Sequence, residues 1–392
     1  MLKGMRVLSF CHYLQGPAAV QYLADLGAEV IKIEPRNGAF ERRWAGADTF
    51  IGDVSVFFLA ANRNQRSLAV DLKHPEARTV LERLVGATDV LVENYRPGTM
   101  ARLGLGYEQV RAIRPDIIYA SATGYGAEGP LRDRPGQDLL VQARSGLIRA
   151  SGAQPTPTGC AAIDQHGASL LALGIVAAYS ARLVTGQGRR VESNLLNAAI
   201  DLQSEALTLY YSGNQTTAQL ARDAHLGTWY HEAPYGVYAL ADADIVISLT
   251  SVASFAEALG DAPLKALASR DPYKDRDAIA RATAEALKPW RYADLVRILD
   301  AAGIWHERVV DYDDLRTDPQ ALHNQVFRAL PVGTGEATLI NHPVRYDGEV
   351  PPLRRPPPQL GEHTREILAE LAFSDSEIAS LLASGAVTGP SA

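Results

Sequence analysis

The chain has little cysteine and no cluster of basic residues. Only two of its 392 residues are cysteines, Cys11 and Cys160, too few for a disulfide framework or a cysteine-ligated zinc site. A reducing, cytoplasmic compartment is therefore expected. The formal net charge is -7 and no Lys/Arg block occurs, so we predict no nucleic-acid partner and no binding to an anionic membrane.

Long apolar runs are also lacking. After Lys3 and Arg6 the N-terminus offers only "VLSF", shorter than the core of a signal peptide. The most apolar stretch, residues 168–184, contains serines, Tyr179 and Arg182 and is shorter than the ~20 residues of a membrane span. We expect it to be a buried helix. Hydrophobic residues make up 47% of the chain and charged residues 21%, as is typical of a globular enzyme.

Glycine-rich loops that hold phosphates are missing as well. A first strand, a helix and a second strand end at Glu34, where a dinucleotide fold has its ribose-binding acid. The turn after the first strand, "CHYLQGP", lacks the glycines that let a backbone approach a pyrophosphate, so NAD is disfavoured. There is no GxxxxGK[ST] loop, no HExxH pair and no EF-hand loop, and no metal site is predicted.

What the first third does contain is a regular alternation of apolar strands and amphipathic helices. The helix "PAAVQYLADLG" is expected to start at Pro17 and to stop at Gly27. Alternation of this kind predicts a parallel sheet with helices on both faces. The expected strands are "MRVLSF", "AEVIKIE", "RSLAVDL", "DVLVEN" and "IIYASATGYG".

The pattern changes further along the chain. Residues 165–212 are mainly helical, and "PYGVYALADADIVISLT" is typical of a β-hairpin, followed by helices over 253–306. This middle block is expected to be a smaller α+β domain. The segment "PPLRRPPPQLGEH" should run extended because proline cannot occupy a helix interior. Two terminal helices follow, the second with Ser374 and Glu377 spaced as a capping box.

Asp164 lies between a Pro/Gly/Thr-rich loop and the apolar run, and two roles are open. Asp is a favoured N-cap, and a carboxylate kept ionised by the helix dipole is also a usable nucleophile. The N–H groups from Gln165 to Gly167 could then serve as oxyanion donors. A thiolate–base pair of Cys160 and His166 is less favoured, because closeness in sequence does not make a catalytic pair.

Seven separated segments, in order and spanning nearly the whole chain, resemble the class III CoA-transferases. This family includes formyl-CoA transferase, carnitine CoA-transferase and α-methylacyl-CoA racemase. The segments are "GMRVLSFCHYLQGPAAVQYLADLGAEVIKIEP", "NRNQRSLAVDLKHPEAR", "DVLVENYRPGTMARLGLGYE", "YASATGYGAEGP", "AAIDQHG", "TGQGRRVESNLLNAAI" and "PPPQLGEHTREIL".

The resemblance implies an α/β fold: a large domain with a Rossmann-like parallel sheet plus a smaller α+β domain. In that family two chains form a homodimer of interlocked rings. The implied organisation is a large CoA-binding domain over 1–205, a linker over 206–225, the small domain over 226–325, and a return linker with C-terminal helices over 326–392.

The resemblance also implies the site residues. Asp164 occupies the position of the catalytic aspartate. Coenzyme A carries phosphates, which favour Lys and Arg, and an adenine, which favours a flat ring such as Tyr95. His12, Leu14 and Gln15 fall where the family lines the thioester end. The implied CoA-binding set is His12, Leu14, Gln15, Arg36, Lys73, Asn94, Tyr95 and Arg102.

One departure from the family decides the expected reaction. The racemase branch has a histidine in a "GHD"-like triplet, whereas this chain has Gly136, Gln137 and Asp138. Glutamine has no titratable proton and cannot act as a base, although His166 could take its place. We therefore predict CoA transfer from an acyl-CoA to a free carboxylic acid on Asp164, with Gln137 assisting. CoA is a substrate, and no tightly bound cofactor is expected. The alternatives are an acyl-CoA epimerase and a CoA-binding protein without turnover.

Overall fold

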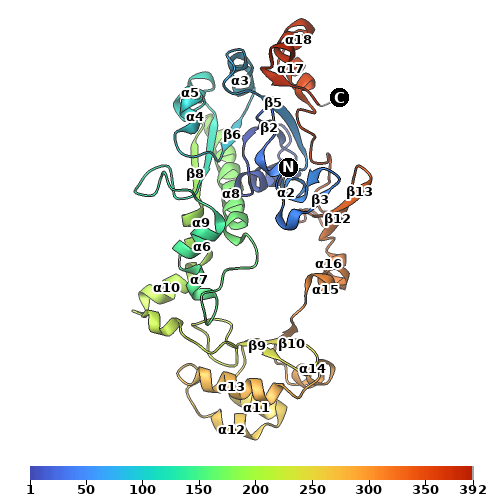
Figure 1. The fold of residues 1–392 in the computed structure, drawn as a ribbon. Helices are drawn as coiled ribbons and strands as arrows, with labels where there is room; N and C mark the ends of the chain where they lie inside the picture. Colours follow the sequence, from blue (N-terminus) through green and yellow to red (C-terminus); the bar gives the residue numbers. More distant parts are fainter. Residues whose placement is uncertain (391–392) are drawn as a thin grey trace. The chain divides into compact units, whose positions relative to one another are not determined.

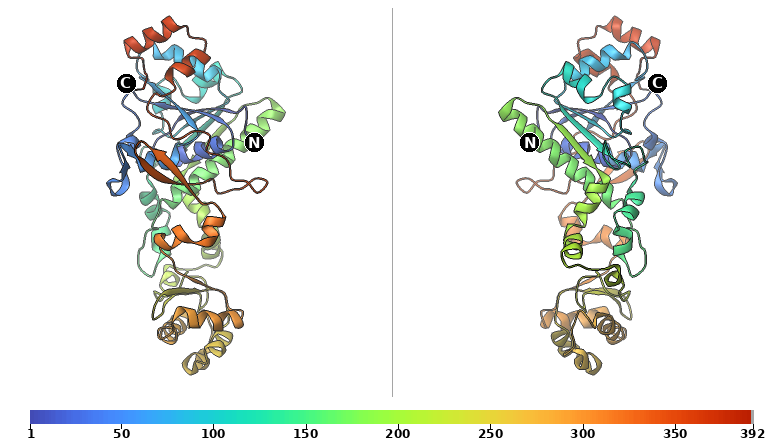
Figure 2. Two further views of the ribbon diagram at one scale, coloured as in Figure 1. Left: turned by 90° about the vertical axis from the view of Figure 1, so that its right-hand side faces the viewer. Right: turned by 90° about the vertical axis from the view of Figure 1, so that its left-hand side faces the viewer.

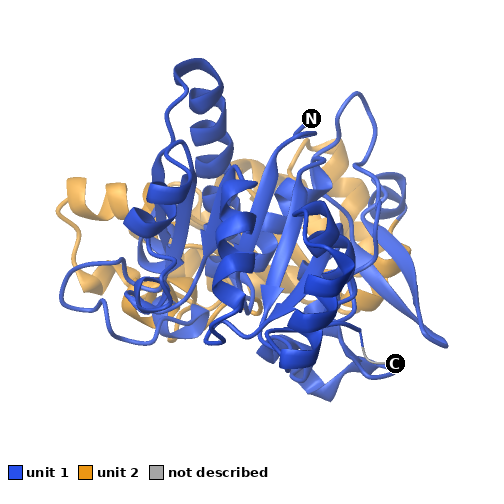
Figure 3. Cartoon of the chain, turned by 90° about the horizontal axis from the view of Figure 1, so that it is seen from above, with its two compact units in different colours: residues 1–141, 161–202, 319–392 blue, residues 142–160, 203–318 orange. Residues whose placement is uncertain are grey.

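A computed structural model describes residues 1–390 of the chain. These residues form two compact units, which Figure 3 shows in different colours. Unit 1 contains residues 1–141, 161–202 and 319–392, so the chain leaves it and returns to it twice. Unit 2 contains residues 142–160 and 203–318.

Unit 1 is built on a seven-stranded sheet of order β14-β5-β2-β1-β6-β7-β8 (Figure 1). All neighbouring strands are parallel except β14, which pairs antiparallel with β5. The predicted parallel sheet is therefore confirmed, with one additional antiparallel edge strand. The strands are β1 (Arg6–Phe10), β2 (Glu29–Glu34), β5 (Gln65–Val70), β6 (Val90–Glu93), β7 (Ile118–Thr123), β8 (Arg190–Asn194) and β14 (Val387–Thr388).

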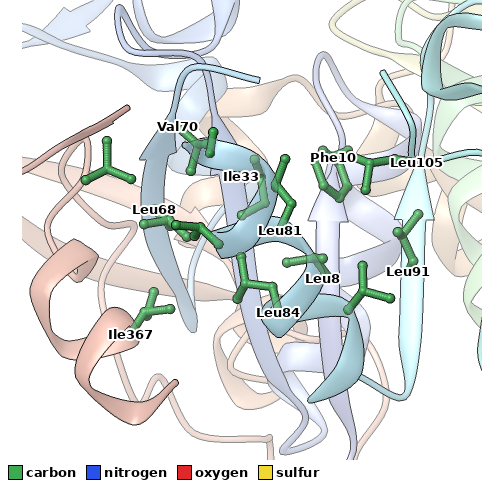
Figure 4. Packing of buried hydrophobic residues seen from close by; sticks show 14 of the residues in the cluster. Leu8, Phe10, Ile33, Leu68, Val70, Leu81, Leu84, Leu91, Leu105 and Ile367 are labelled. Atoms are coloured by element: carbon green, nitrogen blue, oxygen red, sulfur yellow. The ribbon is translucent and has the colours of Figure 1, made fainter. Parts of the chain in front are cut away.

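Helices cover both faces of this sheet (Figure 2). Successive residues of a strand point to opposite faces, so Leu8 and Phe10 of β1 join one apolar cluster and Val7 joins the other. The first cluster lies under α3 (Ala77–Gly86), α4 (Thr99–Arg102), α5 (Tyr107–Ile113), α17 (Thr364–Glu370) and α18 (Asp375–Ser384), and part of it is drawn in Figure 4. The second lies under α1 (Gln15–Asp25) and α8 (Ala162–Thr185).

Several shorter elements complete unit 1. Two antiparallel strand pairs were not predicted, β3 with β4 and β12 with β13. The capping box predicted for the last helix is present at Ser374 and Glu377. The remaining strands and helices are β3 (Phe50–Ile51), β4 (Val54–Ser55), α2 (Val56–Ala61), α9 (Leu195–Leu202), α16 (Pro319–His323), β12 (Phe327–Val332), β13 (Gly335–Ile340) and the 3-10 helices η1 (Phe40–Arg42) and η2 (Gly46–Asp48), with the chain passing from unit 1 into unit 2 within α6 (Asp138–Arg144).

Unit 2 contains the predicted β-hairpin, β9 (Gly236–Ala239) with β10 (Asp244–Ile247), extended by β11 (His306–Arg308) to a three-stranded antiparallel sheet. Tyr238 and Ile245 of this sheet pack in one apolar core with Phe255 and Leu295 of the helices. The helices of the unit are α7 (Leu147–Ser151), α10 (Ser204–Ser212), α11 (Val252–Leu259), α12 (Ala262–Leu267), α13 (Arg276–Leu287), α14 (Tyr292–Ala301) and α15 (Tyr312–Thr317).

The proline-rich segment 351–358 lies outside any helix, as predicted, with bends at Arg355 and Pro357, and a buried polar network ties it and its flank to the rest of unit 1. Arg63 Nη2 lies 2.6 Å from Asp25 Oδ2, and its Nη1 donates to the Ile340 carbonyl at 2.7 Å. Asn64 Oδ1 accepts the Arg354 N–H at 2.6 Å. Asp25 and Arg63 are only 4% and 6% exposed, so this ion pair is anchored inside the unit.

Helix α8 is longer than the sequence indicated. It has 24 residues where an apolar run of 168–184 was expected, and by length and composition alone it could cross a membrane. This is weak evidence, because the core helix of a soluble protein meets the same criteria. Only 33% of its most apolar window is buried. The buried residues face α1 and the sheet, among them Gly167, Leu171 and Ile175.

Candidate active site

Asp164 is not the cap of its helix. Helix α8 begins at Ala162, which places Asp164 in the first turn. The reading of Asp164 as the N-cap of the apolar run is therefore wrong. Its carboxylate has no hydrogen-bond partner or ion pair within residues 1–390, and its side chain is half-buried. The carboxylate is thus free to meet a substrate.

The capping role belongs to Asp138, which lies in the triplet singled out from the sequence. Its Oδ2 accepts the backbone N–H of Ile163 at 2.8 Å and of Asp164 at 3.0 Å. These N–H groups have no partner inside the helix, and the carboxylate of a buried residue satisfies them from another segment. Asp138 therefore fixes the backbone that carries Asp164.

The pKa of Asp164 is raised, whereas the helix end was expected to keep the carboxylate ionised. Burial, and next the negative charge of Asp138, raise the pKa of Asp164 from its ordinary 3.8 to about 7. The Gln165 N–H, which was expected to be an oxyanion donor, instead donates to the Ala161 carbonyl. A carboxyl with a pKa near neutrality, in a half-buried place, is the kind of group found at functional sites.

The side chains flanking Asp164 do not supply a second base. His166 Nε2 lies 2.8 Å from Asp201 Oδ2. Residues two apart on an α-helix point about 200° from one another, so the His166 ring lies on a different face from Asp164. Gln137, which the family resemblance aligns with the racemase histidine, is exposed and directly precedes Asp138.

The turns after β1 and β6 meet at the point where strand order reverses. From β1 the chain continues to β2 on one side, and β6 lies on the other side, which is the switch point where open parallel sheets bind ligands. Asn94 clamps the His12 backbone there: its Oδ1 accepts the His12 N–H at 3.0 Å and its Nδ2 donates to the His12 carbonyl at 2.7 Å. The His12 and Tyr95 ring centroids are 5.1 Å apart.

Leu14 and Gln15 follow in the same turn. Helix α1 begins at Gln15, two residues before the predicted start at Pro17. Leu14 packs against the cluster under α1 and α8. Gln15 is buried and contacts α8 at Gly167. The structure therefore brings His12, Gln15 and Asn94 to one edge of the sheet in unit 1.

The three basic residues predicted to contact CoA are Arg36, Lys73 and Arg102. Each is exposed and follows a strand of the sheet, β2, β5 and β6 respectively. The carboxyl ends of parallel strands share one edge of a sheet. Within residues 1–390 none of the three has an acidic partner within 4 Å. Their charges are therefore available to an anion.

Glu34, by contrast, cannot serve as a ribose-binding acid. It is 1% exposed, and Arg42 binds both of its carboxylate oxygens, at 2.6 and 2.7 Å. Burial opposes the charged form, but the hydrogen bonds and charge of Arg42 outweigh it and lower the pKa of Glu34. The disfavoured NAD interpretation therefore gains no support. In the described part of the chain no group of three or more His, Cys, Asp or Glu residues could hold a metal ion.

Sequence reasoning missed Glu93 at the end of β6. It is 8% exposed, and burial raises its pKa to about 7. Its Oε2 accepts the Tyr95 N–H at 2.9 Å, which shapes the turn that carries Asn94 and Tyr95. The available signal was an acid that ends an apolar run, "DVLVEN".

Comparison with known proteins places the chain in a family. Residues 2–364 match the model of CoA-transferase family III. The chain therefore belongs to this family, as its resemblance implied, and it is an enzyme of the class III CoA-transferase type.

Characterised relatives extend over the whole chain. It is 33% identical to succinyl-CoA:glutarate CoA-transferase of Homo sapiens over 400 residues, which cover 98% of this chain and 90% of the relative. It is 31% identical to acetyl-CoA:oxalate CoA-transferase of Acetobacter aceti, covering 95% of this chain and 96% of the relative. A CAIB/BAIF family protein from Brucella suis superposes with a TM-score of 0.80 at 28% identity, over 94% of this chain and 99% of that one.

Proposed function

We propose that this enzyme moves CoA from an acyl-CoA donor to a free carboxylic acid through covalent intermediates on Asp164. The observation that carries the proposal is the uncommitted carboxylate of Asp164 on a helix end that Asp138 caps. A carboxylate that is neither capping nor ion-paired can attack a thioester. Relatives named as CoA-transferases for carboxylic acids such as glutarate and oxalate support the same reaction class.

The proposed reaction begins when the Asp164 carboxylate attacks the donor thioester, which forms a mixed anhydride and releases CoA thiolate. The thiolate then attacks the Asp164 carbonyl, which gives an aspartyl-CoA thioester and frees the donor acid. The acceptor carboxylate attacks this thioester, CoA thiolate leaves again, and it returns to the acyl carbon of the new anhydride. One thioester replaces another, so no external energy source is required. Anhydrides hydrolyse readily, and the site must therefore exclude water.

The rival reactions have less support. Epimerisation at the α-carbon needs two proton-transfer groups. Gln137 has no titratable proton. His166 is hydrogen-bonded to Asp201 and lies on a different face of α8 from Asp164. A CoA-binding protein without turnover would retain CoA binding after Asp164 is replaced and would show no transfer before replacement.

We propose that Arg36, Lys73 and Arg102 bind the CoA phosphates, with Tyr95 against the adenine. Removing one such cation should raise KM for acyl-CoA roughly tenfold, since a hydrogen bond to a charged group contributes about 1.5–3 kcal/mol, and the effect should shrink at high salt. The test is KM for Lys73→Ala and Arg102→Ala. Arg78→Ala is the control, because Arg78 is an exposed arginine already paired with Glu82 at 2.8 Å. An unchanged KM in both test variants would contradict this assignment.

We also propose that the enzyme is a homodimer in which a second copy covers the apolar face of α8. Leu173, Leu183 and Val184 of this helix are 65%, 72% and 87% exposed, and exposed apolar side chains that gather on one element are typical of protein–protein contacts. Sedimentation equilibrium should give twice the 42.3 kDa chain mass at micromolar concentration. A monomer that transfers CoA at full rate would contradict the proposal.

A further inference from the structure

Gln15, the first residue of α1, has a buried donor with no partner. The residue is 5% exposed, and its Nε2 makes no hydrogen bond to any residue the structure describes. An unpartnered buried N–H carries a free-energy cost, which a hydrogen bond to a bound substrate group would remove. Gln21 on the same helix shows the usual arrangement: its Nε2 donates to the Ala60 carbonyl and its Oε1 accepts the Arg63 N–H.

The unpartnered nitrogen lies beside the proposed nucleophile's helix. A Cβ built on Gly167 would be 2.7 Å from Gln15 Nε2, so the amide occupies the space that any side chain at 167 would need. Gly167 follows Asp164 by three residues, which puts both on one face of α8. Because Cα–Cβ bonds tilt toward the N-terminus of a helix, the amide lies on the side of Gly167 that faces the Asp164 turn.

Neighbouring donors are already committed. Asp138 takes the N–H groups of Ile163 and Asp164, and the Gln165 N–H bonds to the Ala161 carbonyl. The Asn94 amide donates to the His12 carbonyl. The Gln165 N–H, the first of the backbone donors expected to stabilise an oxyanion at Asp164, is thus engaged, and the Gln15 amide is available in its place.

We propose that Gln15 is a catalytic residue whose Nε2 donates a hydrogen bond to the carbonyl oxygen carried by Asp164. This inference rests on the proposed function. When CoA thiolate adds to the Cγ carbon of the anhydride, a C–S bond forms and the C=O electron pair moves to oxygen. The Gln15 N–H stabilises that oxyanion, which then collapses and expels the donor carboxylate. The same contact serves when the acceptor carboxylate adds to the aspartyl-CoA thioester.

The test measures steady-state CoA transfer by Gln15→Ala and Gln15→Glu, with the thermal midpoint of each. Loss of one oxyanion donor costs about 10²–10³-fold in kcat, so we expect that loss in Gln15→Ala with KM for acyl-CoA within about twofold of wild type. Gln15→Glu keeps the shape but replaces the donor by an acceptor, and kcat should be at least as low. Gln21→Ala is the matched control: it removes a satisfied buried glutamine of α1 and should lower the thermal midpoint with kcat unchanged.

A second variant acts on the same contact without deleting the amide. Gly167→Ala should push the Gln15 amide from its place and lower kcat, whereas in a Gln15→Ala background the added methyl group enters vacated space and should lower kcat no further. This non-additivity is the signature of a shared interaction. A merely structural loss would instead move the thermal midpoint and add in the double variant.

The outcomes separate the two proposals. If wild type transfers CoA, Asp164→Asn does not, and Gln15→Ala keeps kcat within about threefold, the role of Gln15 is overturned and the proposed function stands. If wild type transfers no CoA across a panel of acyl-CoAs and carboxylic acids, the proposed function fails and the role of Gln15 fails with it.

Discussion

Asp164→Asn should reduce CoA transfer by at least about 10³-fold, because the amide cannot form the anhydride that begins the reaction. The variant should fold normally. Asn has nearly the same size, the Asp164 side chain makes no internal hydrogen bond, and the N–H groups bound by Asp138 belong to the backbone. The measurement is the appearance of new acyl-CoA masses with several donor and acceptor pairs. Activity within tenfold of wild type would rule out Asp164 as the nucleophile.

The same residue should set the acid limb of the pH profile. With a pKa of about 7, the ionised fraction of Asp164 falls below neutrality, and kcat/KM should drop about tenfold per pH unit there. Asp138→Asn removes the neighbouring negative charge and should move this limb to lower pH. A pH profile that is flat between 5 and 8 at about 25 °C would contradict the assignment.

The pH dependence of folding stability is an independent test of the raised pKa of Asp164. The folded-state pKa of Asp164 lies above its ordinary 3.8, so the folded protein binds the proton more tightly and loses stability as pH rises from about 4 to about 7. Asp164→Asn should therefore melt at a higher temperature than wild type at pH 8. The difference should vanish below about pH 4, where both states of the wild type are protonated.

Breaking the buried Asp25–Arg63 pair should have the largest effect on stability. Asp25→Ala leaves the Arg63 guanidinium buried without a carboxylate, which typically costs about 3–5 kcal/mol. Asp25 also accepts from Asn64, which holds Arg354 of the return segment. The free energy of unfolding in urea measures the loss, and a change below about 1 kcal/mol would contradict it.

The control for this prediction is an exposed pair. Glu82→Ala removes a carboxylate that lies 2.8 Å from Arg78 with both side chains largely exposed, and it should cost under about 1 kcal/mol. The Asp25 effect should also depend on pH. Burial opposes its charge, but the nearby His342, whose Nδ1 lies 3.5 Å from Asp25 Oδ2, and the hydrogen bonds and charge of Arg63 lower its pKa. Its contribution is present above about pH 4 and is lost as pH falls through the folded-state pKa.

The sequence predicted the sheet of unit 1 well because its signals are local. Runs such as "MRVLSF" and "AEVIKIE" became β1 and β2, and the capping box at Ser374 marked the start of α18. The edge strand β14 escaped prediction because two residues, Val387 and Thr388, carry no periodicity of their own. Its pairing with β5 is a contact between distant parts of the chain.

The site was predictable in its residues but not in its arrangement. The motif placed Asp164 at a helix start, yet the apolar periodicity began at 168 and gave no sign that α8 starts at Ala162. That start is fixed by Asp138, which is 25 and 26 residues away from the N–H groups it accepts. The contact of Gln15 with Gly167 likewise joins two helices that are far apart in the chain. The roles of the CoA-binding set and the domain bounds given above remain predictions.

The most direct test of covalent catalysis on Asp164 is an oxygen-label experiment. The enzyme is first charged with acyl-CoA, then given one equivalent of an acceptor acid labelled with ¹⁸O in both carboxyl oxygens, and the peptide that contains Asp164 is weighed by mass spectrometry. Attack of the acceptor on an aspartyl-CoA thioester, followed by return of CoA, leaves one acceptor oxygen on Asp164. We predict one ¹⁸O in that peptide. Formation of labelled acyl-CoA without any label in the peptide would contradict the account.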